Sequence, residues 1–194
     1  ARAINERYAY HLLQEIVEEN PFLGRFYDNI EEWSFQTEMF FLCNRYKQLT
    51  DIKNLFIEQG KSVVSDYNIF KNAIFAHRTL QRGELDKYLQ IYDILTADMP
   101  SPTLIIHISA SVETIMSRIA KRNREFEHNM DPNYIRALRD DYNSFFKSYE
   151  LSNPDVPVLH LSGDDLDFVN RPQDLDYIFR QIDETLTKEQ LKHA

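Results

Sequence analysis

The stretch "PTLIIHISASVETIMSRIAKR", residues 102–122, joins the clearest strand of this sequence to a helix. Residues 102–110 form a short apolar run introduced by Pro100 and Pro102, which is typical of a strand buried on both faces. Residues 111–122 then read as a helix. A buried strand that passes directly into a helix is the first half of a βαβ unit, so this stretch indicates a parallel sheet covered by helices.

The rest of the chain repeats this alternation. We expect strands over residues 10–17, 61–67 and 156–163, and helices over residues 31–59, 69–80, 85–99, 133–149 and 172–191. The helix 31–59 ends at Gly60 and carries an apolar stripe formed by Phe35, Met39, Leu42, Tyr46 and Leu49. The predicted fold is therefore α/β, a three-layer structure with a parallel sheet flanked by helices, and residues 1–194 are expected to form a single domain.

Ligands of such sheets bind at the carboxyl ends of the strands, which here carry Glu15, Asp66 and the loop after Gly163. If the strands that end at Glu15 and Asp66 are neighbours, the two carboxylates share one site. A carboxylate at a strand end is more often simply solvated, however, and the pattern alone leaves both interpretations open.

The charge and composition exclude several classes of protein. A formal net charge of −9 argues against a general binder of nucleic acid or anionic membranes, because such proteins need a basic face. No apolar run approaches the length of about 18 residues that a membrane span requires. The single cysteine, Cys43, excludes an internal disulfide and suits a reducing, cytoplasmic location, and no Cys/His cluster has zinc-ligand spacing. An anionic ligand must therefore be held by a local cluster of cations.

One such cluster is "SRIAKRNREFE", residues 117–127. Its cations are Arg118, Lys121, Arg122 and Arg124. They have two possible roles: they complement the dipole at the end of a helix, or their forked guanidinium groups bind phosphate oxygens. The spacing favours neither.

The helix 31–59 offers a second candidate site. At about 100° per residue, Glu38 and Arg45 lie on nearly the same line of the helix, at one edge of the apolar stripe and with Phe41 beyond them. The pair either sits on a half-solvated margin or faces a pocket, in which a planar polar ligand satisfies both charges.

Five blocks of this sequence resemble the deoxynucleoside kinases, in the family's order and spacing: "EIVEENPFL…FY", "EEWSFQTEMFFLCNRYKQL", "VVSDYNIFKNAIFA", "LIIHISASVETIMSRIAKRNREFE" and "DDLDFV". The resemblance spans essentially the whole chain. Within the family, "WSFQTEMFFLC" resembles the Gram-positive bacterial deoxyguanosine kinases. The resemblance to the family implies a P-loop kinase-like fold and phosphoryl transfer from ATP, with Mg²⁺, to the 5′-hydroxyl of a deoxynucleoside.

The resemblance also assigns expected roles to individual residues. Glu15 falls on the general base, and Asp66 on an acid that holds magnesium, with Glu15 helping through water. Tyr27 and Glu127 fall on the pair that binds the sugar 3′-hydroxyl. Glu38 falls on the glutamine that reads the base and Arg45 on its arginine partner, with Phe41 and Asn72 beside them. A lid over about residues 118–130 supplies Arg118, Arg122 and Arg124 to the phosphates, and a loop around the ATP adenine supplies Asp165, Asp167 and Phe168.

The chain departs from the family pattern at several positions. Ile16 replaces a proline, Tyr67 stands where the family has an arginine after the acid, and Asn72 replaces an acid that orients the base-reading arginine. The phosphate-binding loop and the first strand are absent from the residues given. The chain opens "ARAINERY" in a helical pattern, and the family's loop would end just before it, so we expect further residues upstream.

The donor and acceptor pattern of Glu38 predicts the base. An ionised carboxylate only accepts hydrogen bonds, which suits the adjacent N1–H and N2–H₂ donors of guanine, and Arg45 can donate to O6 or N7. We therefore expect conversion of deoxyguanosine to dGMP in nucleotide salvage. The alternatives are a deoxyadenosine or broad-specificity kinase and a nucleoside-binding pseudo-kinase without the loop. A homodimer is expected from the family.

Overall fold

The computed structural model describes residues 1–17 and 19–192, and its chain divides into two compact units. The first contains Ala1–Pro100 and Glu125–Met130, and the second contains Ser101–Arg124 and Asp131–Ala194. The expected lid over residues 118–130 is thus shared between the units, and a single domain stays a prediction. Each unit holds one parallel pair of strands in its described residues, which confirms the α/β class with parallel strands.

The strands of the first unit are shorter than predicted. After helix α1 (Arg2–Tyr8), strand β1 (His11–Leu13) pairs with strand β2 (Val63–Ser65). The ladder stops beyond Leu13 because the backbone N–H of Glu15 bonds to the carboxylate of Asp66, 2.8 Å away, instead of a strand carbonyl. A side chain therefore ends the strand that the apolar pattern extended to residue 17.

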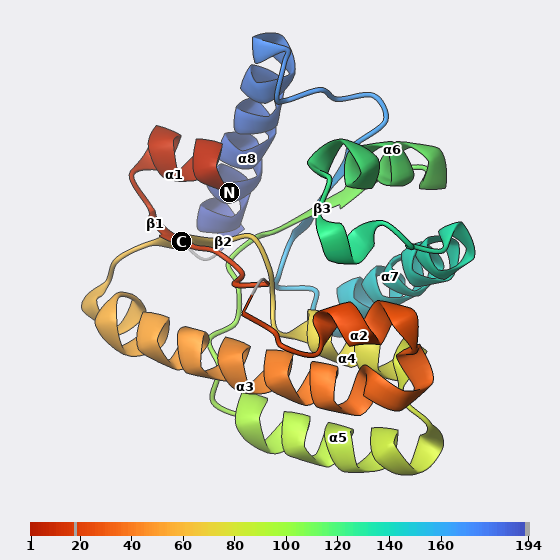
Figure 1. The fold of residues 1–194 in the computed structure, drawn as a ribbon. Coiled ribbons are helices and arrows are strands. Elements are labelled where there is room, and N and C mark those ends of the chain that lie inside the picture. The colour runs from red at the N-terminus through yellow and green to blue at the C-terminus, as the bar shows by residue number, and fades with distance from the viewer. Residues whose placement is uncertain (18, 193–194) are drawn as a thin grey trace. The chain divides into compact units, whose positions relative to one another are not determined.

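Four helices complete the first unit: α2 (Leu23–Asp28), α3 (Ile30–Leu55), α4 (Phe70–Thr79) and α5 (Arg82–Thr96). Figure 1 shows α2, α4 and α5 lying along α3. The side chain of Asn29 caps α3 by accepting from Glu32, and acidic residues in its first turn suit the helix dipole. The predicted helix 31–59 breaks at Phe56 and ends in a short 3₁₀ turn (Ile57–Gln59), after which Gly60 takes a left-handed φ of 69°. The six-residue α2 was not predicted.

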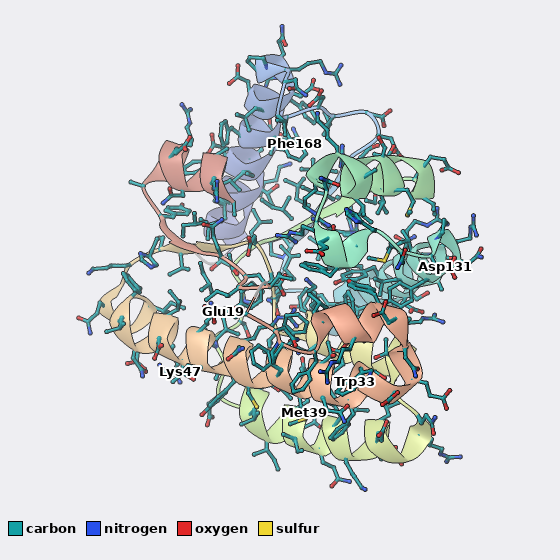
Figure 2. All side chains as sticks on the ribbon, viewed as in Figure 1. Glu19, Trp33, Met39, Lys47, Asp131 and Phe168 are labelled. Atoms are coloured by element: carbon teal, nitrogen blue, oxygen red, sulfur yellow. The ribbon has the colours of Figure 1, made fainter. Side chains whose placement is uncertain are left out.

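The core of the first unit lies between α3, α4 and α5. Leu42 and Tyr88 are fully buried there, and Phe35 and Met39 pack against them. Figure 2 shows Met39 between Trp33 and Lys47 along α3. The predicted stripe is wrong at Tyr46, whose exposed fraction is 36%.

The second unit follows the sequence prediction closely. Strand β3 (Ile105–Ser109) pairs in register with β4 (Val158–Ser162), and helices α6 (Val112–Arg122), α7 (Pro132–Ser152) and α8 (Pro172–Lys192) alternate with them (Figure 1). Ser111 and Asp131 cap α6 and α7, and Asn123 ends α6 in a left-handed conformation. None of the helices in the described part of the chain is long and apolar enough to cross a membrane.

Candidate active site

Glu15 and Asp66 follow the carboxyl ends of β1 and β2, which are neighbouring strands, so the condition that the sequence left open for a shared site is met. The Asp66 carboxylate accepts from the backbone N–H of Glu15 at 2.8 Å, and the backbone N–H of Asp66 donates to Leu13 at 3.2 Å. These two bonds fix the loops after both strands against each other. They leave the carboxylate of Glu15 free to face away from Asp66 toward α3 and α4.

Two cations hold the Glu15 carboxylate. A terminal guanidinium nitrogen of Arg45 binds Oε1, and the ammonium of Lys71 donates to Oε2 at 2.8 Å. The Glu15 side chain is 14% exposed, so these pairs are largely removed from water. Burial alone would raise the pKa of Glu15, but attraction by Lys71 and Arg45 outweighs it and holds the pKa below its usual range. Glu15 is therefore ionised at neutral pH, as a proton acceptor must be.

Glu38 lies in the opposite electrostatic state. Glu38 is buried, with an exposed fraction of 2%, and no group among the described residues hydrogen bonds to its carboxyl. Burial raises its pKa to about 8, with Arg45 and Lys71 pulling the other way and Glu15 adding to the rise. A buried carboxyl without partners is costly unless a ligand supplies them.

Arg45 lies beside Glu38 and is also buried, with an exposed fraction of 4%. Its guanidinium carbon is 4.7 Å from the centre of the Phe41 ring and 5.6 Å from that of Tyr67, a cation–π arrangement. Its Nε is buried without a hydrogen-bond partner among the described residues. The structure therefore contradicts a half-solvated margin for Glu38 and Arg45, and both retain polar groups that a ligand can satisfy.

Asn72 fixes Arg45 from α4. Its side-chain oxygen accepts from Nη1 of Arg45 at 2.6 Å, and its side-chain nitrogen donates to the hydroxyl of Tyr88 at 3.1 Å. Asn72 is fully buried. The departure from an acid at this position thus leaves Arg45 oriented by a neutral acceptor, whose amide is itself held by Tyr88.

A cavity of about 350 Å³ opens next to α2 in the first unit. Its walls include Asn20, Gly24, Tyr27 and Phe126. The rings of Tyr27 and Phe126 are stacked, with centroids 6.3 Å apart and planes inclined by 2°. Glu127, next in the chain, is buried with an exposed fraction of 7%. The structure therefore brings the two residues expected at the sugar, Tyr27 and Glu127, into one unit beside a cavity.

The three arginines expected on the phosphates belong to the second unit. Arg118 donates to the carbonyl of Gly163 at 2.6 Å, Arg122 ends α6 at its exposed face, and Arg124 follows the left-handed Asn123. A Cβ at Gly163 would lie 3.0 Å from both Nη1 of Arg118 and the carbonyl of Ser109, so the close approach requires glycine. Both roles of this basic cluster stay open.

The loop after β4 is bound to the start of α6. Asp164 accepts from the backbone N–H of Ser111 at 2.8 Å and from its hydroxyl at 3.0 Å. In the same loop, hydrogen bonds from Asn170 lower the pKa of Asp167. Of the residues expected at the adenine, Asp165 is exposed, and Asp167 and Phe168 are half-buried; Figure 2 labels Phe168.

Sequence reasoning missed Lys71 and Asp164. Lys71 contacts a residue 56 positions away, and no local pattern marks that contact. Asp164 was not named as a site residue, although it begins the loop after Gly163 that the sequence places at the end of a strand.

The described residues contain no group of three or more potential metal ligands. Asp66 is a single carboxylate, which suits magnesium because that ion commonly uses one or two carboxylates together with phosphate oxygens and waters. Glu15 already carries two cations, which disfavours a third in direct contact.

Comparison with known proteins places these residues in context. The sequence model of the deoxynucleoside kinase family matches residues 1–187. Deoxyguanosine kinase of Bacillus subtilis (strain 168) is 45% identical over 96% of this chain and 90% of its own length. Deoxyadenosine/deoxycytidine kinase of the same organism is 28% identical over 98% of this chain and 88% of its own. The structure of deoxyadenosine kinase from M. mycoides with bound dATP has a TM-score of 0.78 and 24% identity, covering 94% of this chain and 90% of that one, which shows a shared fold.

Proposed function

Because this chain belongs to the deoxynucleoside kinase family, whose members are phosphotransferases, we propose that it transfers a phosphoryl group from ATP to the 5′-hydroxyl of deoxyguanosine. The observation that carries the choice of base is the buried carboxyl of Glu38, which has no hydrogen-bond partner among the described residues and lies beside Arg45. The similarity to a deoxyguanosine kinase supports the same choice.

Guanine matches the polar groups that Glu38 and Arg45 leave unsatisfied. The ionised carboxylate accepts from N1–H and N2–H₂, and the free Nε–H of Arg45 can donate to O6 or N7. Adenine and cytosine each place a ring acceptor beside the amino group, which an ionised Glu38 repels. Since the pKa of Glu38 in the free protein is about 8, guanine must bind with loss of a proton at neutral pH.

The residues of the first unit supply the remaining steps. Glu15, kept ionised by Lys71 and Arg45, accepts the proton of the 5′-hydroxyl. Tyr27 and Glu127 are proposed to bind the 3′-hydroxyl of the sugar. Asp66 is proposed to hold magnesium, which neutralises phosphate charge when bound with the donor.

For the second unit, the proposal concerns the donor nucleotide. Arg118, Arg122 and Arg124 are proposed to neutralise charge on the phosphates, as guanidinium groups do in other phosphoryl transfers. Asp165, Asp167 and Phe168 are proposed to surround the adenine of ATP. Homodimerisation stays a prediction.

One observation favours deoxyadenosine as a second substrate. A protonated Glu38 presents one donor and one acceptor, and this edge pairs with N1 and the 6-amino group of adenine. Below pH 8 the protonated form prevails in the free protein. Deoxyadenosine is therefore expected as the weaker substrate, most evident at acidic pH.

The test is an activity panel with the natural full-length protein, ATP, Mg²⁺ and each of the four deoxynucleosides. Deoxyguanosine is expected to have the highest kcat/KM at pH 8, and Glu15→Gln should lower kcat by about 10²- to 10⁴-fold, the usual contribution of a general base. Binding of deoxyguanosine without any turnover would instead establish a pseudo-kinase, and a preference for another nucleoside would overturn the role of Glu38.

A further inference from the structure

Lys71 occupies a position that a helix alone disfavours. It is the second residue of α4 (Phe70–Thr79), where a positive charge opposes the dipole of the helix, and the first turn contains no acidic residue. Its ammonium lies 5.6 Å from the centre of the Phe75 ring and 2.8 Å from Oε2 of Glu15. The Lys71 side chain is 27% exposed, so the charge has been drawn inward from solvent. Residues that conflict with their local structure are often kept for function.

The two cations on Glu15 have different surroundings. Arg45 also binds Asn72 and lies beside Glu38, so it belongs to the base-reading cluster as well. Among the described residues, the ammonium of Lys71 has Glu15 as its only hydrogen-bond partner. Of the two cations, Lys71 is therefore the one that binds only the Glu15 carboxylate among the described residues.

In the described part of the chain, no side chain other than Arg45 and Lys71 hydrogen bonds to the Glu15 carboxylate. Tyr67 stands at the position where the family pattern has an arginine, but its hydroxyl donates to Gln48 at 2.7 Å and its ring faces Arg45. Asp66 bonds to the backbone of Glu15 and not to its side chain. The orientation of the Glu15 carboxylate thus depends on Arg45 and Lys71.

We propose that Lys71 is a positioning residue that orients the carboxylate of Glu15 to accept the proton of the substrate hydroxyl. This inference rests on the proposed function. Two donors on opposite oxygens fix both the direction and the plane of a carboxylate, whereas Arg45 alone leaves it free to turn. Loss of Lys71 should therefore impair the chemical step much more than the binding of the nucleoside.

The experiment compares kcat and KM for deoxyguanosine in Lys71→Gln, Lys71→Met and Lys71→Arg of the full-length protein. We expect the two neutral variants to lower kcat by about 10- to 100-fold, the effect of a reacting group displaced by about 1 Å, with KM changed less than about threefold. Lys71→Arg should recover most of kcat because it keeps the charge. Lys47→Gln, which removes an exposed ion pair with Asp51 on α3 (Figure 2), is the matched control and should be silent.

A structural role for Lys71 gives a different result. If Lys71 is only structural, the neutral variants have a lower melting temperature while their kcat stays within about threefold of the wild-type value. Alternatively, Lys71→Arg has a kcat as low as that of Lys71→Gln. Either outcome overturns the inference. If one neutral variant does not fold, the other is compared with Lys71→Arg by the same criterion. Failure of the wild-type protein to phosphorylate any deoxynucleoside would overturn the proposed function instead, and this inference with it.

Discussion

Replacing Glu38 by glutamine should remove both the preference for guanine and its dependence on pH. Glu38→Gln keeps the shape of the side chain but puts an amide donor where the ionised carboxylate accepts. One correct bidentate pair discriminates between bases by about 1–3 kcal/mol, or roughly 5- to 150-fold. At pH 8, kcat/KM for deoxyguanosine should therefore decrease by a factor in this range in Glu38→Gln, while kcat/KM for deoxyadenosine should rise.

The magnitude of the pH effect follows from the burial of Glu38. Because the pKa of Glu38 is about 8, the ratio of ionised to protonated carboxyl rises tenfold per pH unit. The ratio of kcat/KM for deoxyguanosine to kcat/KM for deoxyadenosine should therefore rise by about 100-fold from pH 6 to pH 8 in the wild-type protein. Titration of Glu15 cancels in this ratio, since Glu15 is the general base for both substrates.

The assay is a direct competition between the two nucleosides, with both monophosphates measured at pH 6, 7 and 8. Glu38→Gln should give a ratio that does not change with pH. A wild-type ratio that is flat over this range, or an unchanged guanine preference in Glu38→Gln, would refute the argument that the carboxylate reads the base.

Three further predictions concern stability. The usual pKa of a glutamate is 4.5, and that of Glu38 in the folded protein is about 8. Between these two pH values the folded protein keeps a proton on Glu38 that the unfolded chain has lost, so the free energy of unfolding should fall as pH rises, by at most about 1.4 kcal/mol per pH unit. In urea unfolding at pH 6, 7 and 8, the free energy of unfolding should change with pH more negatively in the wild type than in Glu38→Gln. Glu15, with its lowered pKa, is ionised in both states there, and His107, whose pKa is lowered to about 4, contributes equally to both proteins and cancels in the difference. Tyr88→Phe should cost about 1–3 kcal/mol in the same assay because it leaves the buried side-chain nitrogen of Asn72 unpaired, and an unchanged midpoint would contradict that bond. Gly163→Ala should cost about 1–3 kcal/mol because its Cβ meets a backbone oxygen at 3.0 Å. Gly24→Ala, in helix α2 and with no atom within 4 Å of the added carbon, should cost nothing or stabilise the helix slightly.

Periodicity predicted the parts of the site that lie on regular elements. Glu38 and Arg45 are seven positions apart, which is nearly two full helical turns, so a single helix face holds both. Glu15 and Asp66 follow two strands that pair in parallel, and the carboxyl ends of parallel neighbours meet. The helical period alone brings Glu38 and Arg45 together, whereas Glu15 and Asp66, 51 positions apart, also require β1 and β2 to be neighbours.

The parts that were missed depend on tertiary packing. The contact between Lys71 and Glu15 requires α4 to approach the end of β1, and the sequence around Lys71 carries no sign of it. Helix α2 has six residues, too few to show a period, and its end at Asp28 passes almost directly into α3. Tyr46 matches the apolar stripe of α3, but it is 36% exposed and is not among the side chains that pack against Leu42 and Tyr88 in the described core.

The most direct measurement of the central claim is a crystal structure of the protein with deoxyguanosine. We predict both oxygens of the Glu38 carboxyl at about 2.7–3.2 Å from N1 and N2 of guanine, and Glu15 within the same distance of the 5′-oxygen. A guanine bound away from Glu38, or a 5′-oxygen out of reach of Glu15, would contradict the account.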